Sequence, residues 1–196
     1  MLDLQPATDE VTRLLDGLRD DDLRRPTPCD GTPVAALLDH LLGLSQAFTN
    51  AARKTIPPGG SQPPRSAAEN LDPDWRTVLP VRLRILADAW RDPAAWQGAT
   101  EAGGVQLPGE IAGVVALDEV VLHGWDLARA TGQKYTCDPV SAAAVLEFTS
   151  NAARPENAPM REGLFGPVVD VPDDAPVFDR ALGYAGRDPG WTPGPR

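Results

Sequence analysis

The chain has 196 residues and a formal net charge of -10, with 28 Asp and Glu against 18 Lys and Arg. This charge excludes proteins that hold nucleic acid or an anionic membrane surface through clustered Lys and Arg. The sequence has no run near the roughly 18 apolar residues that a membrane span needs, and no basic and apolar leader at its N-terminus. We therefore expect one cytoplasmic domain over residues 1–196.

The helix starts can be read from the sequence. Four times a Thr or Asp stands directly before a proline that opens an apolar-periodic run, which is the pattern of an N-cap followed by the first helical residue. These pairs are Thr32-Pro33, Asp72-Pro73, Asp92-Pro93 and Asp138-Pro139. Together with the apolar spacing they predict an all-α fold. The expected helices cover about 6–18, 33–53, 73–90, 109–131, 139–153 and 175–185.

Two long connections interrupt this helical pattern. Residues 55–70 are rich in Pro and Gly and predict a loop, which at this length is either a lid or disordered. Residues 98–109 predict an irregular connection with room for a small hairpin. Residues 154–196 follow the fifth predicted helix, and we expect them to form a C-terminal extension that packs on the bundle.

The two histidines of the chain, His40 and His123, both lie inside apolar helical runs. Glu119 precedes His123 by four residues, so the carboxylate and the imidazole share one helix face, about 40° apart. If the helix that carries His40 packs against this one, the three side chains can meet between the helices. Two imidazoles and one carboxylate would hold zinc or a similar ion and leave an open coordination position, as in catalytic sites.

Simpler interpretations of these residues stay open at this point. A histidine in an apolar helix is often a core residue with a satisfied hydrogen bond, and a Glu and His pair at this spacing can be a surface contact. Asp126 shares the face of Glu119 and His123. It is our candidate catalytic residue, as an acceptor that orients His123, an extra ligand or a base. The alternative for Asp126 is an ion pair with Arg129, three residues later.

The two cysteines, Cys29 and Cys137, indicate no disulfide framework, since thiols in the cytoplasm stay reduced. Cys29 precedes a predicted helix, and a nucleophilic role is the alternative to a structural one. We favour the structural role, because a buried cysteine usually behaves as a small apolar side chain.

Several segments together resemble one known family. They are Leu2-Asp3-Leu4 with Pro6-Ala7, Pro26-Thr27-Pro28-Cys29, 37–43, 118–128 and Gly186-Arg187-Asp188-Pro189-Gly190-Trp191. In these segments the chain resembles the actinobacterial metal-binding proteins related to the N-terminal domain of mycothiol-dependent maleylpyruvate isomerase, in the DinB-like superfamily. One departure is Thr32, where relatives commonly carry a tryptophan.

The resemblance implies a DinB-like four-helix bundle with short additional helices and irregular loops. It also implies an internal divalent metal, usually zinc, held by His40, Glu119 and His123. Related enzymes use the open position to activate a low-molecular-weight thiol such as mycothiol for isomerisation or S-transfer. We therefore expect a thiol-dependent isomerase or transferase that acts on a small molecule.

Two other functions are alternatives to this expectation. The first is a metal-dependent hydrolase that uses bound water, and the second is a metal-binding bundle without catalytic activity. A homodimer is compatible with the five tryptophans of the chain, because bundle proteins with many exposed tryptophans often bury some of them between subunits.

Overall fold

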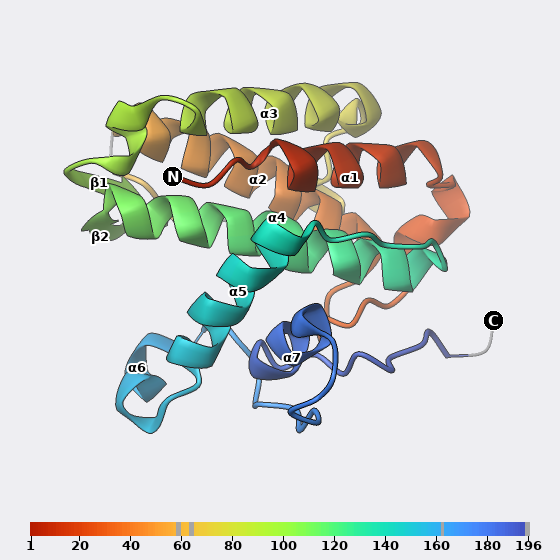
Figure 1. Ribbon diagram of the computed structural model, residues 1–196. Helices are drawn as coiled ribbons and strands as arrows, with labels where there is room; N and C mark the ends of the chain where they lie inside the picture. The colour runs from red at the N-terminus through yellow and green to blue at the C-terminus, as the bar shows by residue number, and fades with distance from the viewer. Residues whose placement is uncertain (58–59, 63–64, 162, 195–196) are drawn as a thin grey trace.

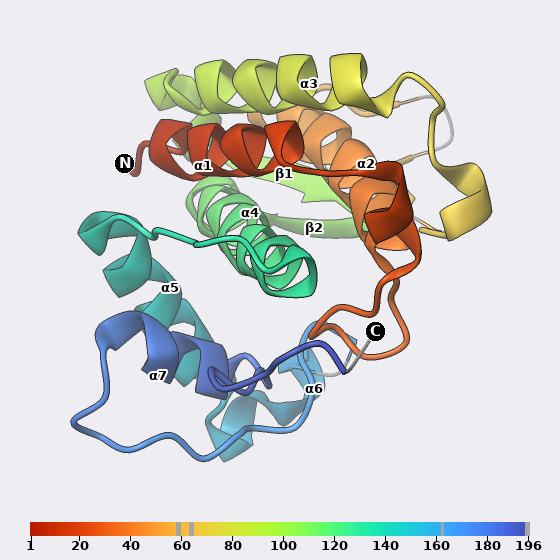
Figure 2. The same cartoon turned by 90° about the vertical axis from the view of Figure 1, so that its right-hand side faces the viewer.

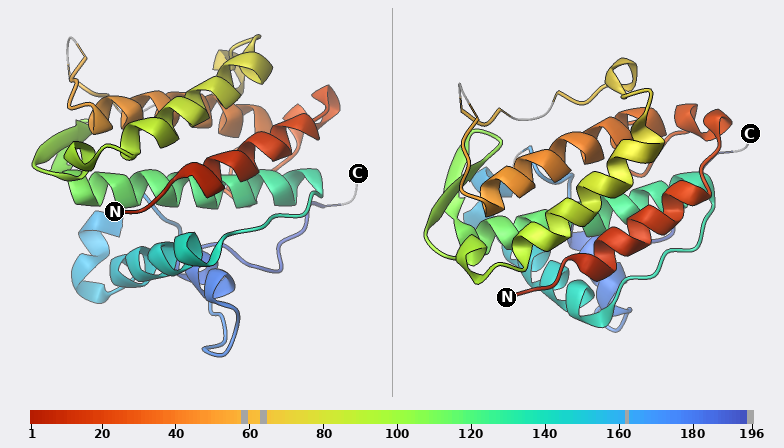
Figure 3. Two further views of the ribbon diagram at one scale, coloured as in Figure 1. Left: turned by 45° about the horizontal axis from the view of Figure 1, so that its top comes forward. Right: turned by 90° about the horizontal axis from the view of Figure 1, so that it is seen from above.

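A computed structural model describes residues 1–57, 60–62, 65–161 and 163–194. Four helices form a bundle in which α1 and α4 run in one direction and α2 and α3 run in the other (Figure 1): α1 Gln5–Asp16, α2 Val34–Ala52, α3 Trp75–Trp90 and α4 Gly109–Thr131. Helix α2 packs against α3 and α4, and α1 packs against the same two helices, so α1 and α2 lie on one diagonal (Figure 3). The predicted all-α, DinB-like four-helix bundle is confirmed.

The remaining elements lie at the margins of the bundle. Helices α5 Pro139–Ala152, α6 Ala158–Arg161 and α7 Val177–Tyr184 gather on the side of α4 that faces away from α1 and α2 (Figure 2). The connection before α4 holds the expected hairpin, with strand β1 Ala99–Ala102 paired antiparallel to β2 Val105–Pro108. Single turns of tighter helix are η1 Asp20–Arg24, η2 Ala68–Asn70, η3 Pro93–Trp96 and η4 Pro155–Asn157. Within the predicted loop 55–70, residues 58–59 and 63–64 lie outside the described residues.

Two of the four predicted helix caps are confirmed. The Asp138 side chain accepts hydrogen bonds from the backbone N–H groups of Val140 and Ser141 at the start of α5. Asp92 caps η3 by accepting from the backbone N–H of Ala94. Both are short acceptors that satisfy N–H groups left free by the first helical turn.

The other two predicted caps are wrong by one or more residues. Thr32 does not cap α2: Pro33 takes the N-cap position, and the Thr32 hydroxyl donates to the backbone carbonyl of Asp30 at 3.4 Å. Asp72 accepts a hydrogen bond from the backbone N–H of Asp74. Helix α3 begins at Trp75, two residues after the predicted start at Pro73. In each case the residue predicted as the helix cap takes part in a turn that precedes the helix.

Helix α4 is the centre of the molecule. It is apolar on most sides, and such a helix is typically covered all round. Accordingly α1 and α2 cover one side of α4 and α5 covers another, so Val120, Val121 and Leu127 have no exposed surface. Gly124 lets α1 approach closely, because a Cβ at this position would lie 2.9 Å from Val11 Cγ2. Within the described residues, no helix is both long enough and apolar enough to cross a bilayer.

Candidate metal centre

The packing of α2 against α4 brings His40, Glu119 and His123 together. Glu119 Oε2 lies 3.2 Å from His40 Nε2 and 3.1 Å from His123 Nε2. The two imidazole rings meet edge to face, with centroids 4.8 Å apart and planes at 84°. In the described part of the chain, this is the one group of three or more His, Cys, Asp or Glu side chains whose ligand atoms lie within 4.8 Å of one another.

These distances fit a small divalent ion. Bonds of about 2.0–2.1 Å from zinc to nitrogen or oxygen, arranged as a tetrahedron, place neighbouring ligand atoms about 3.3 Å apart. The two distances to Glu119 Oε2 are 3.2 and 3.1 Å, close to this value. Imidazole nitrogen and carboxylate oxygen are also donors that zinc accepts readily. The three residues therefore fit a metal ion that has a further position free.

The three side chains are open to the outside of the bundle to different degrees. The exposed fraction is 25% for the side chain of His40, 22% for Glu119 and 12% for His123. A buried structural site would show less exposure at all three residues. The three side chains therefore form a partly exposed group.

Asp126 lies behind His123, with no exposed surface. Its Oδ2 lies 3.0 Å from His123 Nδ1, the ring nitrogen that points away from Glu119. Arg187, in the segment after α7, donates to both carboxylate oxygens of Asp126, from Nε at 2.9 Å and from Nη2 at 2.8 Å. Both oxygens are thus engaged by the protein, which favours the orienting role among the three that the sequence leaves for Asp126.

Without a metal ion, the hydrogen-bonded and charged neighbours outweigh burial in setting the pKa values of Glu119, His123 and Asp126. Burial alone would raise the pKa of Glu119, but hydrogen bonds from His123 and His40 hold it well below its usual range. Burial would lower the pKa of His123, but the carboxylates of Asp126 and Glu119 raise it to about 10. For Asp126, burial opposes ionisation, and the Arg187 guanidinium outweighs it and holds the pKa low. Glu119 and Asp126 are therefore both ionised at neutral pH.

The alternative ion pair between Asp126 and Arg129 is wrong. Arg129 turns the other way, and its Nε donates to the backbone carbonyl of Trp191 at 2.9 Å. A spacing of three residues allows the pair, but Arg187 occupies both oxygens of the carboxylate. Sequence reasoning assigned no role to Arg187, although this residue stands in the Gly186–Trp191 segment that contributes to the family resemblance.

His40 has an outer partner that the sequence did not indicate. Its Nδ1 lies 3.1 Å from the hydroxyl oxygen of Ser66, in the connection between α2 and α3. No local pattern marks this serine, because the contact depends on how a long loop folds back over α2. Each imidazole thus has one nitrogen near Glu119 and the other near an oxygen from elsewhere in the chain.

Neither cysteine belongs to this cluster, and both are free thiols. Burial, followed by the nearby carboxylates of Asp138 and Glu10, raises the pKa of Cys137 to about 12. The thiolate is the reactive form of cysteine, so such a thiol is a poor nucleophile at neutral pH. This environment favours a structural role for Cys137 over a nucleophilic one.

In a Cys29→Ser variant, the alkylation of Cys137 by iodoacetamide should be slow and strongly dependent on pH. At pH 8 the thiolate fraction is smaller by roughly three orders of magnitude than for a free cysteine. The rate should rise about tenfold per pH unit from pH 8 to about pH 11, because the thiolate fraction does so below the pKa, and mass spectrometry of quenched samples measures it. N-acetylcysteine is the control, and a rate for Cys137 that levels off at the same pH as this control would contradict the raised pKa.

The chain is similar in sequence to one family of protein domains and to a mycobacterial protein. The model of the mycothiol maleylpyruvate isomerase N-terminal domain matches residues 4–128, which include His40, Glu119, His123 and Asp126. An uncharacterised protein of Mycobacterium tuberculosis, from strains CDC 1551 / Oshkosh and ATCC 25618 / H37Rv, is 27% identical over 191 residues. The aligned region covers 93% of this chain and 94% of that protein.

Two solved structures share the fold. The crystal structure of the mycothiol-dependent maleylpyruvate isomerase superposes with a TM-score of 0.57 at 20% identity, over 96% of this chain and 79% of the other. A mutant of that enzyme, with a histidine replaced by alanine, gives 0.56 over the same shares of the chains. Because the family model spans more than half of the sequence, the chain belongs to the family of mycothiol maleylpyruvate isomerase N-terminal domains.

Proposed function

We propose that the protein is a metal-dependent enzyme that activates a low-molecular-weight thiol for isomerisation or S-transfer on a small molecule. His40, Glu119 and His123 would hold the divalent ion, with zinc as the first choice for two imidazoles and a carboxylate. The observation that supports this most is the meeting of both His Nε2 atoms at Glu119 Oε2, at 3.2 and 3.1 Å. The thiol is suggested by the name of the related isomerase.

Each part of the cluster has a distinct task in this proposal. When bound, the ion would lower the pKa of a thiol at its open position, which supplies a nucleophile near neutral pH. Asp126 fixes the ring of His123, and Arg187 balances the buried charge of Asp126. Asp126 has no exposed surface, so we assign it as a positioning residue rather than one that touches substrate. The partly exposed side chains of His40 and Glu119 leave a path for a small substrate.

The proposed use of a thiol also suggests the compartment in which the protein works. We propose that it works in the cytoplasm, where low-molecular-weight thiols are kept reduced. The two free cysteines agree with such a compartment.

Cobalt substitution tests the thiol role directly. Co²⁺ takes the same ligands as zinc and is coloured, so a sulfur ligand should add a charge-transfer band to the spectrum of the loaded protein. We expect mycothiol to produce this band and S-methyl mycothiol, which lacks an ionisable thiol, to leave the spectrum unchanged. No change at saturating mycothiol would refute the thiol role, and ester or amide turnover without thiol would favour the hydrolase instead.

A further inference from the structure

The connection between α2 and α3 returns to α2 next to His40. Ser66 Oγ lies 3.1 Å from His40 Nδ1, and the backbone N–H of Ala67 donates to Asp39 Oδ2 at 3.1 Å. Two successive residues of the helix thus contact two successive residues of the loop. Such a double contact sets the position of the loop along the helix, since a shift by one residue would break both bonds.

Residues 65–71, which we call the Ser66 segment, have their own internal bonds. Asn70 Nδ2 donates to the backbone carbonyl of Arg65 at 3.1 Å, and the backbone N–H of Asn70 donates to the carbonyl of Ala67 at 3.1 Å. At its far end Leu71 packs against the apolar core. The segment is therefore a folded turn with an apolar anchor at one end and polar bonds to α2 at the other.

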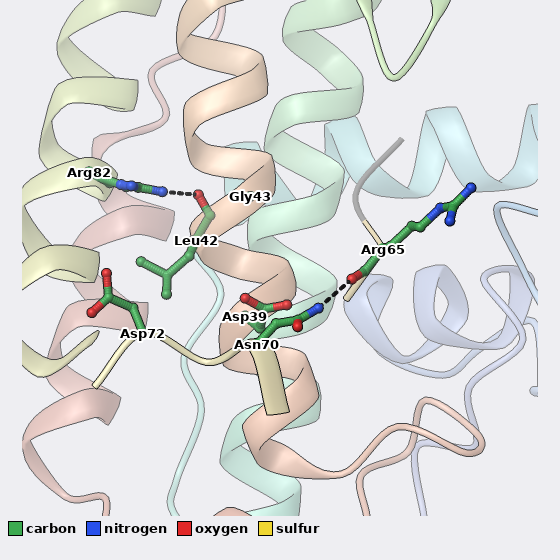
Figure 4. A pocket seen from close by; sticks show the side chains of 7 residues that line it. All are labelled: Asp39, Leu42, Gly43, Arg65, Asn70, Asp72 and Arg82. Atoms are coloured by element: carbon green, nitrogen blue, oxygen red, sulfur yellow. Dashed lines mark hydrogen bonds between the residues drawn. The ribbon is translucent and has the colours of Figure 1, made fainter. Parts of the chain in front are cut away.

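The polar end of the Ser66 segment borders open space. A cavity of about 370 Å³ lies between the segment, α2 and α3, lined by Asp39, Arg65, Asn70 and Arg82 among others (Figure 4). Arg82 of α3 uses its Nη1 to donate to the backbone carbonyl of Leu42, not to the segment. The polar end of the Ser66 segment is therefore held to α2 by its bonds to Asp39 and His40. The cavity separates this end from α3.

We infer that Ser66 is a positioning residue for His40 in the metal centre, and that Asp39 holds Ser66 in place. This inference rests on the proposed metal site. When His40 Nε2 binds an ion, Nδ1 carries the hydrogen and donates it to Ser66 Oγ, which fixes the ring toward Glu119 and His123. Ser66 thus serves His40 as Asp126 serves His123, and this part of the 55–70 loop belongs to the metal centre.

A hydroxyl suits this position for a second reason. It can accept a hydrogen bond from Nδ1–H, and it can also donate to Nδ1 when Nε2–H faces Glu119 in the metal-free protein. A carboxylate, such as that of Asp126, can only accept. Ser66 therefore supports the His40 ring in both tautomers, with and without an ion.

Variants of two serines in the same loop test the inference. Ser66→Ala should weaken zinc binding by about 10–100-fold, the usual effect of removing an outer partner of a ligand. Ser66→Thr keeps the hydroxyl and should restore most of the affinity. Ser61→Ala is the matched control, because Ser61 bonds Glu101 in the hairpin and not His40. Competition with a chromophoric chelator measures the affinities on the full-length protein.

A spectroscopic readout separates positioning from general loss of structure. In the zinc-loaded protein, ¹⁵N-resolved NMR should show a slowly exchanging Nδ1–H of His40 in the wild type and Ser66→Thr, and fast exchange in Ser66→Ala. Asp39→Ala should weaken zinc binding as well, and its effect should not add to that of Ser66→Ala because both act on one contact.

Two outcomes would overturn this role, and they differ in what else they remove. Equal zinc affinity and equal His40 Nδ1–H exchange in Ser66→Ala and Ser61→Ala would overturn the role of Ser66 alone. A wild-type protein that binds no zinc would remove the proposed metal site and this inference together.

Discussion

Replacing Arg187 with methionine should lower the free energy of unfolding by about 3–5 kcal/mol, because it leaves a buried carboxylate without its counter-charge. Asp126 has no exposed surface, and Arg187 is only 8% exposed. Both oxygens of Asp126 accept from the Arg187 guanidinium, at 2.9 and 2.8 Å. Methionine keeps the length of the apolar stem, so the variant isolates the lost charge and hydrogen bonds. Urea unfolding followed by circular dichroism measures the change.

Arg129→Met is the matched control for Arg187→Met. Arg129 bonds the backbone carbonyl of Trp191 and leaves Asp126 alone, so its loss should cost about 1–1.5 kcal/mol. The double variant Asp126→Asn with Arg187→Met should recover part of the stability, since it no longer buries an unpaired charge. If the Arg187→Met and Arg129→Met proteins have the same free energy of unfolding, the buried pair of Asp126 and Arg187 does not contribute the predicted stability.

The same Arg187 substitution should also reach the metal centre. Asp126 that is not held by Arg187 can turn away from His123 Nδ1, and outer contacts of this kind typically change metal affinity by about 10–100-fold. This would link the segment after α7 to a site formed by α2 and α4. The relevant comparison is zinc affinity at a temperature where the variant is fully folded.

Replacing Glu119 with glutamine should reduce zinc affinity by more than about a hundredfold, beyond the effect of an outer contact. Glutamine has the same shape, but it offers the ion a neutral amide in place of the carboxylate whose Oε2 lies near both imidazoles. The low pKa of Glu119, set by hydrogen bonds from His123 and His40 against the effect of burial, keeps this ligand ionised and ready to bind. Zinc titration against a chromophoric chelator measures the loss.

Glu110→Gln provides the matched control for Glu119→Gln. Glu110 lies in the first turn of the same helix and is exposed, so this change alters the net charge by the same amount without touching the cluster. Its zinc affinity should equal that of the wild type. Equal losses in both variants would mean that overall charge, rather than ligation by Glu119, sets the affinity.

The part of the site that lies on α4 could be predicted from the sequence because helical spacing is local. Glu119 and His123 stand four residues apart, and this spacing alone places both on one face. The position of His40 opposite them required that α2 pack on α4, which the apolar faces of a bundle make a reasonable expectation. The bundle itself follows from the same periodicity.

The outer layer of the site could not be predicted in this way. Arg187 reaches Asp126 across 61 residues, and Ser66 reaches His40 across 26. Both contacts depend on how irregular segments fold back on the bundle. No periodic pattern in the sequence predicts the course of such segments. The spacing of Asp126 and Arg129 was a misleading local signal, because a distant arginine takes the carboxylate. Thr32 was a misleading local signal as well, since Pro33 takes the N-cap position of α2.

The most direct measurement is the zinc content of the protein purified without chelator, determined by elemental analysis for the wild type and for Glu119→Gln. We expect about one zinc per wild-type chain, since the three side chains form one site, and a small fraction of that in Glu119→Gln. Negligible metal in the wild type, even after incubation with zinc, would contradict a metal centre at His40, Glu119 and His123.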